Sequence, residues 1–127
     1  MKNLLFDDFF RIRFISTGVE NPDQVSAVLE LNPKHQIYKG HFPNQPVVPG
    51  VCLIQIIKEM LVCSFSKELS LIRTDEAKFL NIIDPLVNPI LQMEAKIKYV
   101  EQNIDVSVVL SNEGQIFMKF RGTFKFS

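Results

Sequence analysis

Residues 47–66, VVPGVCLIQIIKEMLVCSFS, decide the fold. After the Pro-Gly pair at 49–50 the segment contains no further glycine or proline, and Lys58 and Glu59 carry its only charges. Proline is well tolerated in the first turn of a helix, so the pattern predicts a helix that begins just after Pro49 and ends near Ser66. A helix that is apolar on nearly all sides is expected to be enclosed by protein rather than to lie on a surface.

The segments around this helix alternate apolar and polar residues with a period of two, which is typical of strands with one buried face. The clearest are QVSAVLELN at 24–32 and ILQMEAKIKYV at 90–100. Four more segments have strand character: FFRIRFIST at 9–17, LIRTDEAKFL at 71–80 (the weakest), NIDVSVVL at 103–110 and IFMKFRGTFKF at 116–126. A tight turn at Gly114 is expected to join the last two, and Gly122 indicates a bend or bulge.

A sheet with one apolar face needs a cover, and one long apolar helix supplies it. We therefore predict an α+β fold in which a long central helix is wrapped by a curved antiparallel β-sheet. The chain has 127 residues, 46% of them hydrophobic, which is enough to bury a core without metal or disulfides. No repeat or linker marks a boundary, so a single domain over 1–127 is expected.

Charge and cysteine usage exclude several classes of protein. Basic and acidic residues number 14 each, so no net field attracts nucleic acid or an anionic membrane. The apolar runs are shorter than the roughly 20 residues of a membrane span, and MKNLLFDDFF at 1–10 has acidic residues where a secretion signal is apolar. Cys52 and Cys63 lie about 16 Å apart along the predicted helix, too far for a disulfide. We expect a soluble, cytoplasmic protein.

His41 is the first candidate for catalysis. With an ordinary pKa of about 6.5, a histidine acts as a base near neutral pH. His41 lies between Gly40 and the Phe42-Pro43 pair, which constrain its backbone on both sides. The alternative is a histidine at a strand end that is solvated or hydrogen-bonded to the backbone, which is the commoner case for a single histidine.

A stiff segment separates His41 from the helix. The prolines at 43, 46 and 49 reduce the conformational freedom of this segment, although a rigid loop without chemical use remains the alternative. Gly50 and Val51 then present backbone N–H groups at a helix N-terminus, where such groups bind anions or polarise a carbonyl oxygen. A base together with such an N–H pair is suited to removing a proton alpha to a carbonyl.

Gln55 and Glu59 are a polar pair on an otherwise apolar helix. They lie one turn apart and therefore share a face. Buried polar groups need partners, which points to a functional pair, whereas the alternative places Lys58 and Glu59 at a solvent-touching edge of the helix. His35, in the polar segment NPKHQ, is expected to be solvated. The histidines and cysteines lack metal-ligand spacing and no dinucleotide or phosphate-binding glycine motif occurs, so no metal or cofactor is predicted.

GHFPNQPVVPGV, residues 40–51, closely resembles the active-site signature of the 3-hydroxyacyl-acyl-carrier-protein dehydratases of the FabA/FabZ type, His-Phe-Pro-x-x-Pro-x-x-Pro-Gly. AKFLNIIDP at 77–85 and the last strand segment are similar to later parts of that family. The resemblance implies a hotdog fold, in which a long helix is wrapped by an antiparallel sheet. It also implies dimers or dimer-based assemblies with two sites at the subunit interface.

The resemblance assigns roles to the residues that match. His41 is the implied base, which with an acidic residue of the partner subunit removes water from a 3-hydroxyacyl thioester. The implied substrate-binding residues are Phe42, Pro49, Gly50 and Val51, with the N–H groups at 50 and 51 holding the thioester carbonyl. The sequence departs from the family at the acid, fourteen residues after His41, where it has Gln55. An amide cannot donate a proton to a leaving hydroxide, so Glu59, one turn of about 5.4 Å further on, is the hypothetical acid.

Three functions follow as alternatives. The first is dehydration of 3-hydroxyacyl chains on acyl carrier protein to trans-2-enoyl thioesters, in fatty acid or polyene biosynthesis, by a homodimer or a higher dimer-based oligomer. The second is a catalytically weak hotdog subunit that binds acyl chains or forms a heterodimer with an active paralogue that supplies the acid. The third is hydrolysis of acyl thioesters by water.

Overall fold

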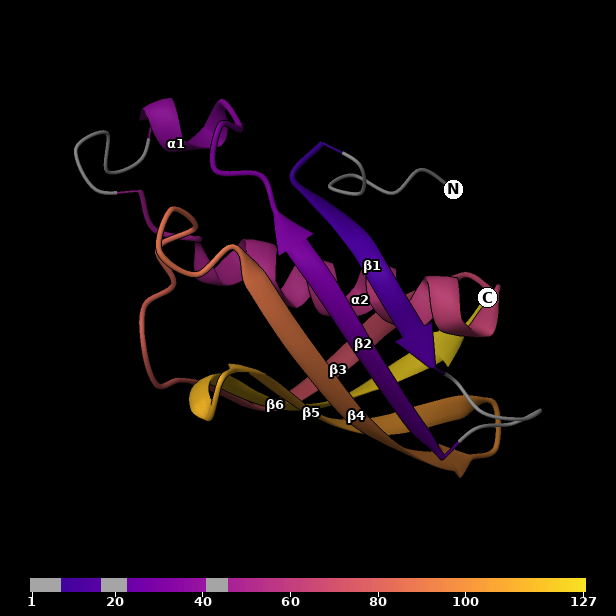
Figure 1. Ribbon diagram of the computed structural model, residues 1–127. Helices are drawn as coiled ribbons and strands as arrows, with labels where there is room; N and C mark the ends of the chain where they lie inside the picture. Colours follow the sequence, from indigo (N-terminus) through magenta and orange to yellow (C-terminus); the bar gives the residue numbers. More distant parts are fainter. Residues whose placement is uncertain (1–7, 17–22, 41–45) are drawn as a thin grey trace.

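Six antiparallel strands form one sheet in the order β1-β2-β4-β5-β6-β3, and one long helix lies against it (Figure 1). The computed structural model describes residues 8–16, 23–40 and 46–127. The elements are β1 Phe10–Ser16, β2 Gln24–Leu31, α1 Ile37–Gly40, α2 Gly50–Phe65, β3 Leu69–Phe79, β4 Ile90–Val100, β5 Asn103–Asn112 and β6 Gln115–Phe126. The predicted α+β class and all six strand segments are therefore confirmed, and the short helix α1 was not predicted.

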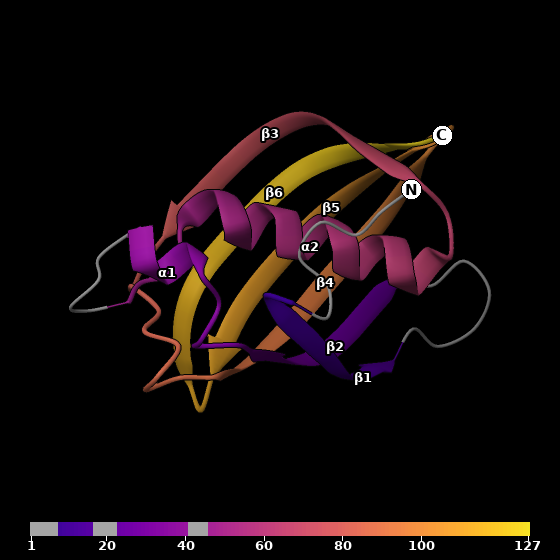
Figure 2. The same ribbon diagram turned by 90° about the horizontal axis from the view of Figure 1, so that it is seen from above.

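Helix α2 crosses the sheet on its inner side. Seen from above, the strands curve past α2, with β3 and β6 on one side of it and β1 and β2 on the other (Figure 2). The helix has 16 residues, which makes it about 24 Å long. Its sheet-facing side chains are buried: Cys52, Leu53, Ile56, Ile57, Glu59, Met60 and Leu61. The helix is less enclosed than its sequence predicts, because Val51 is 75% exposed.

The alternation in the strands predicts the buried face well. In β2 the buried residues are Val25, Ala27, Leu29 and Leu31, and in β5 they are Ile104, Val106, Val108 and Leu110. In β4 the pattern fails only at Tyr99, which was predicted to share the buried face but is 38% exposed. Tyr99 lies at the end of β4, where its ring packs edge-on against Phe65 in the last turn of α2, so the helix covers it incompletely.

The sequence signal at Gly122 corresponds to an irregularity between β6 and β3. Gly122 pairs with Thr74, and the register shifts before the next pair, Glu76 with Arg121. A Cβ at position 122 would lie 2.6 Å from the Arg73 carbonyl oxygen and 2.9 Å from the Phe120 ring. The missing side chain therefore lets the two backbones approach at this point.

Gly122→Ala is expected to destabilise the protein by roughly 2–4 kcal/mol, because the new methyl group meets a backbone oxygen that cannot move without breaking the β3–β6 pairing. Urea unfolding measures the loss. Lys125→Ala, an exposed change in the same strand, should alter stability by less than about 0.5 kcal/mol. Equal unfolding midpoints for the two variants would contradict the proposed close approach.

Candidate active site

The predicted base lies outside the described residues. His41 and Phe42 belong to segment 41–45, so the roles predicted for them stay predictions. The described chain resumes at Pro46, and the N–H of Val48 donates to the carbonyl of Ile83 at 2.9 Å. This bond attaches the proline-rich segment to the loop between β3 and β4.

The N-terminus of α2 has no side-chain cap from its N-cap residue. Pro49 is its N-cap residue, in an extended conformation and without a side-chain hydrogen bond to the helix. The N–H groups of Cys52 and Leu53 both donate to the Pro49 carbonyl, at 3.0 and 3.3 Å. Those of Gly50 and Val51 precede them, in the positions that have no partner within a helix. The carbonyl-binding role predicted for Gly50 and Val51 stays a prediction.

An apolar pocket of about 490 Å³ adjoins this helix end. Its walls come from the proline-rich segment, the first turn of α2 and the β3–β4 loop: Val47, Val48, Pro49, Gly50, Leu53, Phe79, Leu80, Asn81, Ile82 and Ile83. The volume falls within the range of small-molecule sites. A Cβ at Gly50 would lie 2.9 Å from the Phe79 ring, so a glycine here lets that ring lie over the start of the helix.

Gln55 and Glu59 form a hydrogen-bonded pair. The Gln55 Nε2 donates to the Glu59 Oε2 at 3.0 Å, and the Glu59 side chain is fully buried at 0% exposure. The alternative in which Glu59 marks a solvent-touching edge is therefore wrong. A buried carboxyl group needs hydrogen-bond partners, and the Gln55 amide is one of them. Neither residue lines the apolar pocket within this chain, and Gln55 lies about 7.5 Å along the helix axis from Gly50.

His35 is a structural residue, and the prediction that it is solvated is wrong. Its side chain is 13% exposed, because the Nε2 lies 3.0 Å from the Asp8 Oδ2 and the ring packs edge-on against Phe9. The Nδ1 accepts the Ile37 N–H at 3.0 Å. These contacts stabilise the start of α1. The polar segment NPKHQ did not predict the contacts with Asp8 and Phe9, because those residues are distant from it in sequence.

Sequence reasoning also missed Tyr38. Its side chain is buried at 5% exposure, and the hydroxyl has no hydrogen-bond partner in the described part of the chain. Burial raises the pKa of Tyr38, and the nearby Cys52 and Asp84 raise it further, so the phenol is neutral at physiological pH. The available sequence signal was a single aromatic residue shortly before His41.

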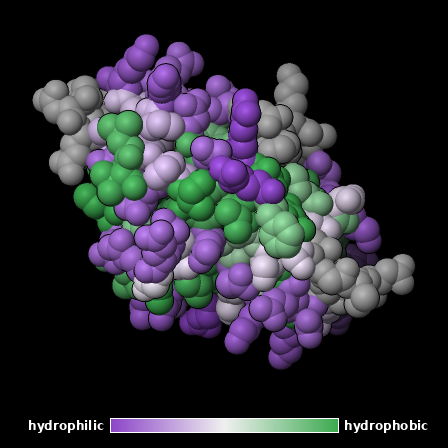
Figure 3. All heavy atoms as spheres, viewed as in Figure 1, coloured by the Kyte–Doolittle hydropathy of each residue, from purple (hydrophilic) through white to green (hydrophobic). Residues whose placement is uncertain are grey.

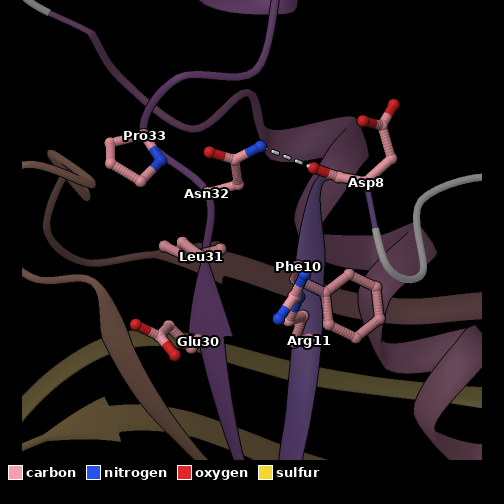
Figure 4. Close-up of a pocket in the computed structure, with 7 residues that line it drawn as sticks. All are labelled: Asp8, Phe10, Arg11, Glu30, Leu31, Asn32 and Pro33. Carbon is pink, nitrogen blue, oxygen red and sulfur yellow. Dashed lines mark hydrogen bonds between the residues drawn. The ribbon is translucent and has the colours of Figure 1, made fainter.

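A further pocket lies at the ends of β1 and β2 (Figure 4). It has a volume of about 300 Å³ and is lined by Asp8, Phe10, Arg11, Glu30, Leu31, Asn32 and Pro33. The Asn32 Nδ2 donates to the Asp8 carbonyl at 2.9 Å, and Glu30 pairs with Arg13 at 3.2 Å. Asn32, Asp8 and Glu30 thus have partners within the protein, and the pocket contains none of the predicted site residues.

The described residues contain no group of three or more histidine, cysteine, aspartate or glutamate side chains that could hold a metal ion. None of the helices that the structure describes is long and apolar enough to cross a membrane.

The comparisons with known proteins identify the family. Residues 18–120 match the model of the ApeI-like family, described as ApeI dehydratase. The chain belongs to the ApeI-like dehydratase family. The match spans well over half of the 127 residues and confirms the expected hotdog-fold dehydratase family, without singling out the FabA/FabZ type. No curated protein matches this ApeI-like chain.

Solved structures share the fold at low sequence identity. The dehydratase heterocomplex ApeI:P from Xenorhabdus doucetiae has a TM-score of 0.71 at 18% identity, covering 90% of this chain and 96% of that chain. An uncharacterized protein from Erwinia carotovora subsp. atroseptica has a TM-score of 0.66 at 18% identity, covering 91% of this chain and 94% of that chain. A hypothetical thioesterase with coenzyme A from Streptococcus pneumoniae TIGR4 has a TM-score of 0.65 at 11% identity, covering 93% of this chain and 85% of that chain. The ApeI-like chain thus has the hotdog arrangement of an antiparallel sheet and a helix.

Proposed function

We propose that this ApeI-like protein converts 3-hydroxyacyl thioesters on acyl carrier protein into trans-2-enoyl thioesters, as the FabA/FabZ-type dehydratases do. One observation carries the proposal: an apolar pocket of about 490 Å³, lined by Gly50, adjoins the first turn of α2, where the N–H groups of Gly50 and Val51 have no partner within the helix. Such a site holds a thioester carbonyl at the helix end and the acyl chain in the pocket.

The reaction is an elimination that needs no cofactor. His41 takes the proton from C2, and the electrons of that C–H bond form the C2–C3 double bond as the C3–O bond breaks. The negative charge that develops on the thioester oxygen is stabilised by the N–H groups at positions 50 and 51. The hydroxide leaves as water once it receives a proton.

Glu59 is the proposed source of that proton. Gln55 occupies the position at which the FabA/FabZ-type dehydratases have an acid. Its amide group can orient a water or a hydroxyl but cannot protonate it. Because the Gln55 Nε2 donates to Glu59, the amide oxygen of Gln55 is directed elsewhere and is suited to accept a hydrogen bond from a water or the substrate hydroxyl. As a carboxylic acid, Glu59 would give its proton to the leaving hydroxyl directly or through a water, and the amide oxygen of Gln55 would hold that water in place.

A second chain is the proposed partner that completes the site. Strand β3 is an edge of the sheet, and its residues 70–75 are exposed. Exposed apolar side chains continue from β3 over the β3–β4 loop: Phe79, Leu80, Ile82, Leu86 and Val87. Figure 3 shows part of this apolar surface at the left of the molecule, where Figure 1 has the loop. Such a surface favours a homodimer, or a heterodimer with a paralogue that contributes an acid. The ApeI:P dehydratase from Xenorhabdus doucetiae is itself a heterocomplex.

The product of a 3-hydroxyacyl-carrier-protein substrate tests the proposed function. We expect mass spectrometry to show the loss of one water from the acyl group while the thioester stays intact. A free carrier thiol would instead identify a hydrolase, the activity named for the hypothetical thioesterase from Streptococcus pneumoniae TIGR4 that shares the fold. A bound but unchanged substrate would identify the acyl-binding subunit. Mass measurement of the protein in solution decides between monomer, homodimer and larger assembly.

A further inference from the structure

Tyr38 carries an unexplained hydroxyl beside the candidate site. Its ring is held in helix α1 by burial and by a tilted contact with Phe9, at 5.7 Å between ring centroids. The hydroxyl is buried, and no described residue forms a hydrogen bond with it. A buried polar group without a partner costs roughly 1–3 kcal/mol, so its presence in a folded protein calls for a ligand or a function.

The surroundings of the hydroxyl connect it to the proposed reaction. Tyr38 precedes His41 by three residues, and Cys52, which lies near its hydroxyl, follows Gly50 by two residues in α2. Asp84 approaches from the β3–β4 loop, where its Oδ1 is already engaged by the Leu86 N–H at 2.8 Å. Tyr38 also borders a pocket of about 590 Å³ that Leu86 helps to line. Tyr38 thus borders the proline-rich segment at Pro46 and the β3–β4 loop at Leu86, and neighbouring residues of both segments line the apolar pocket beside Gly50.

We propose that the Tyr38 hydroxyl donates a hydrogen bond to the 3-hydroxyl oxygen of the bound substrate. This inference rests on the proposed dehydration. The thioester carbonyl is assigned to the N–H groups of Gly50 and Val51, which leaves the 3-hydroxyl as the other oxygen of the reacting part. A neutral phenol keeps its proton and acts as a donor, and a donor at this oxygen stabilises the charge that develops there as the C3–O bond breaks. Tyr38 is thus a residue that distinguishes 3-hydroxyacyl from unsubstituted acyl chains.

Two unreactive probes separate this role from general binding. They are acyl-pantetheine amides, in which nitrogen replaces the thioester sulfur, with and without the 3-hydroxyl group. We expect Tyr38→Phe to weaken binding of the 3-hydroxy amide by roughly 2- to 12-fold, the effect of one hydrogen bond, and to leave the deoxy amide unchanged. Thermal unfolding of the variant without ligand should occur no lower than for the wild type, because the lost hydroxyl had no partner in the protein.

Tyr99→Phe is the matched control, since Tyr99 is the other tyrosine of the chain and packs at the opposite end of α2 against Phe65. It should change binding of neither amide. Equal weakening of both amides by Tyr38→Phe, or no weakening, would overturn the role of Tyr38 while leaving the dehydration intact. If the wild-type protein binds neither amide and forms no enoyl product, the proposed function fails and this inference fails with it.

Discussion

His41→Asn is expected to lower kcat/KM for dehydration by about 10³–10⁴-fold, since it removes the proposed base for the C2 proton. Asparagine is similar in size to histidine and can form hydrogen bonds, but it has no titratable nitrogen. Binding of the unreactive 3-hydroxyacyl amide should therefore change little, because the N–H groups at Gly50 and Val51 and the apolar pocket are untouched. Steady-state kinetics together with calorimetric binding measure both quantities.

His35→Asn provides a matched control, because His35 is the other histidine in the chain. Its Nδ1 accepts the Ile37 N–H, and the side-chain oxygen of an asparagine can accept the same bond. We expect turnover within about threefold of wild type, since no proton transfer is assigned to His35. Equal losses in the two variants would mean that position 41 acts through the structure of the loop, and unchanged turnover in His41→Asn would remove it from the mechanism.

The architecture was predictable because it depends on local patterns. Period-two alternation marks β2, β4 and β5, since one face of each packs on the core and the other meets solvent. The run from Val51 onward predicts α2 within one residue at each end. The segment with the weakest pattern became β3, and its position explains the weakness. An edge strand that is largely exposed on both faces does not need alternating apolar and polar residues, because neither face packs continuously on the core of the chain.

The site was predictable only where it is local in sequence. The Pro49-Gly50 pair predicts where the helix begins, and the four-residue spacing predicts that Gln55 and Glu59 share a face. Contacts between distant segments left no periodic signal. The Phe79 ring over Gly50 joins residues 29 positions apart, and the neighbours of Tyr38 come from α2 and the β3–β4 loop. Such contacts are decided by tertiary packing, which composition and periodicity do not encode.

Glu59→Gln is expected to reduce dehydration by about 10²–10⁴-fold, the usual contribution of a general acid, if Glu59 supplies the proton to the leaving hydroxyl. The change keeps the size of the side chain, and the new amide oxygen can still accept the hydrogen bond from the Gln55 Nε2, so the fold should survive. Glu113→Gln, at an exposed turn, is the matched control and should leave turnover unchanged.

Gln55→Glu distinguishes the two possible positions of the acid. A carboxyl group at the family position is expected to raise turnover in the wild-type background and to restore it in Glu59→Gln, because it protonates the hydroxyl directly. If Glu59→Gln alone leaves turnover untouched, the acid does not come from Glu59. If Gln55→Glu then still raises the turnover of the homomeric protein, a partner chain would be indicated as the natural source of the acid. The opposite result is loss of turnover in Glu59→Gln and its recovery when Gln55→Glu is added. That result would establish that the acid of this chain lies at position 59, one helical turn after position 55, and that Gln55 positions the water or hydroxyl that receives the proton.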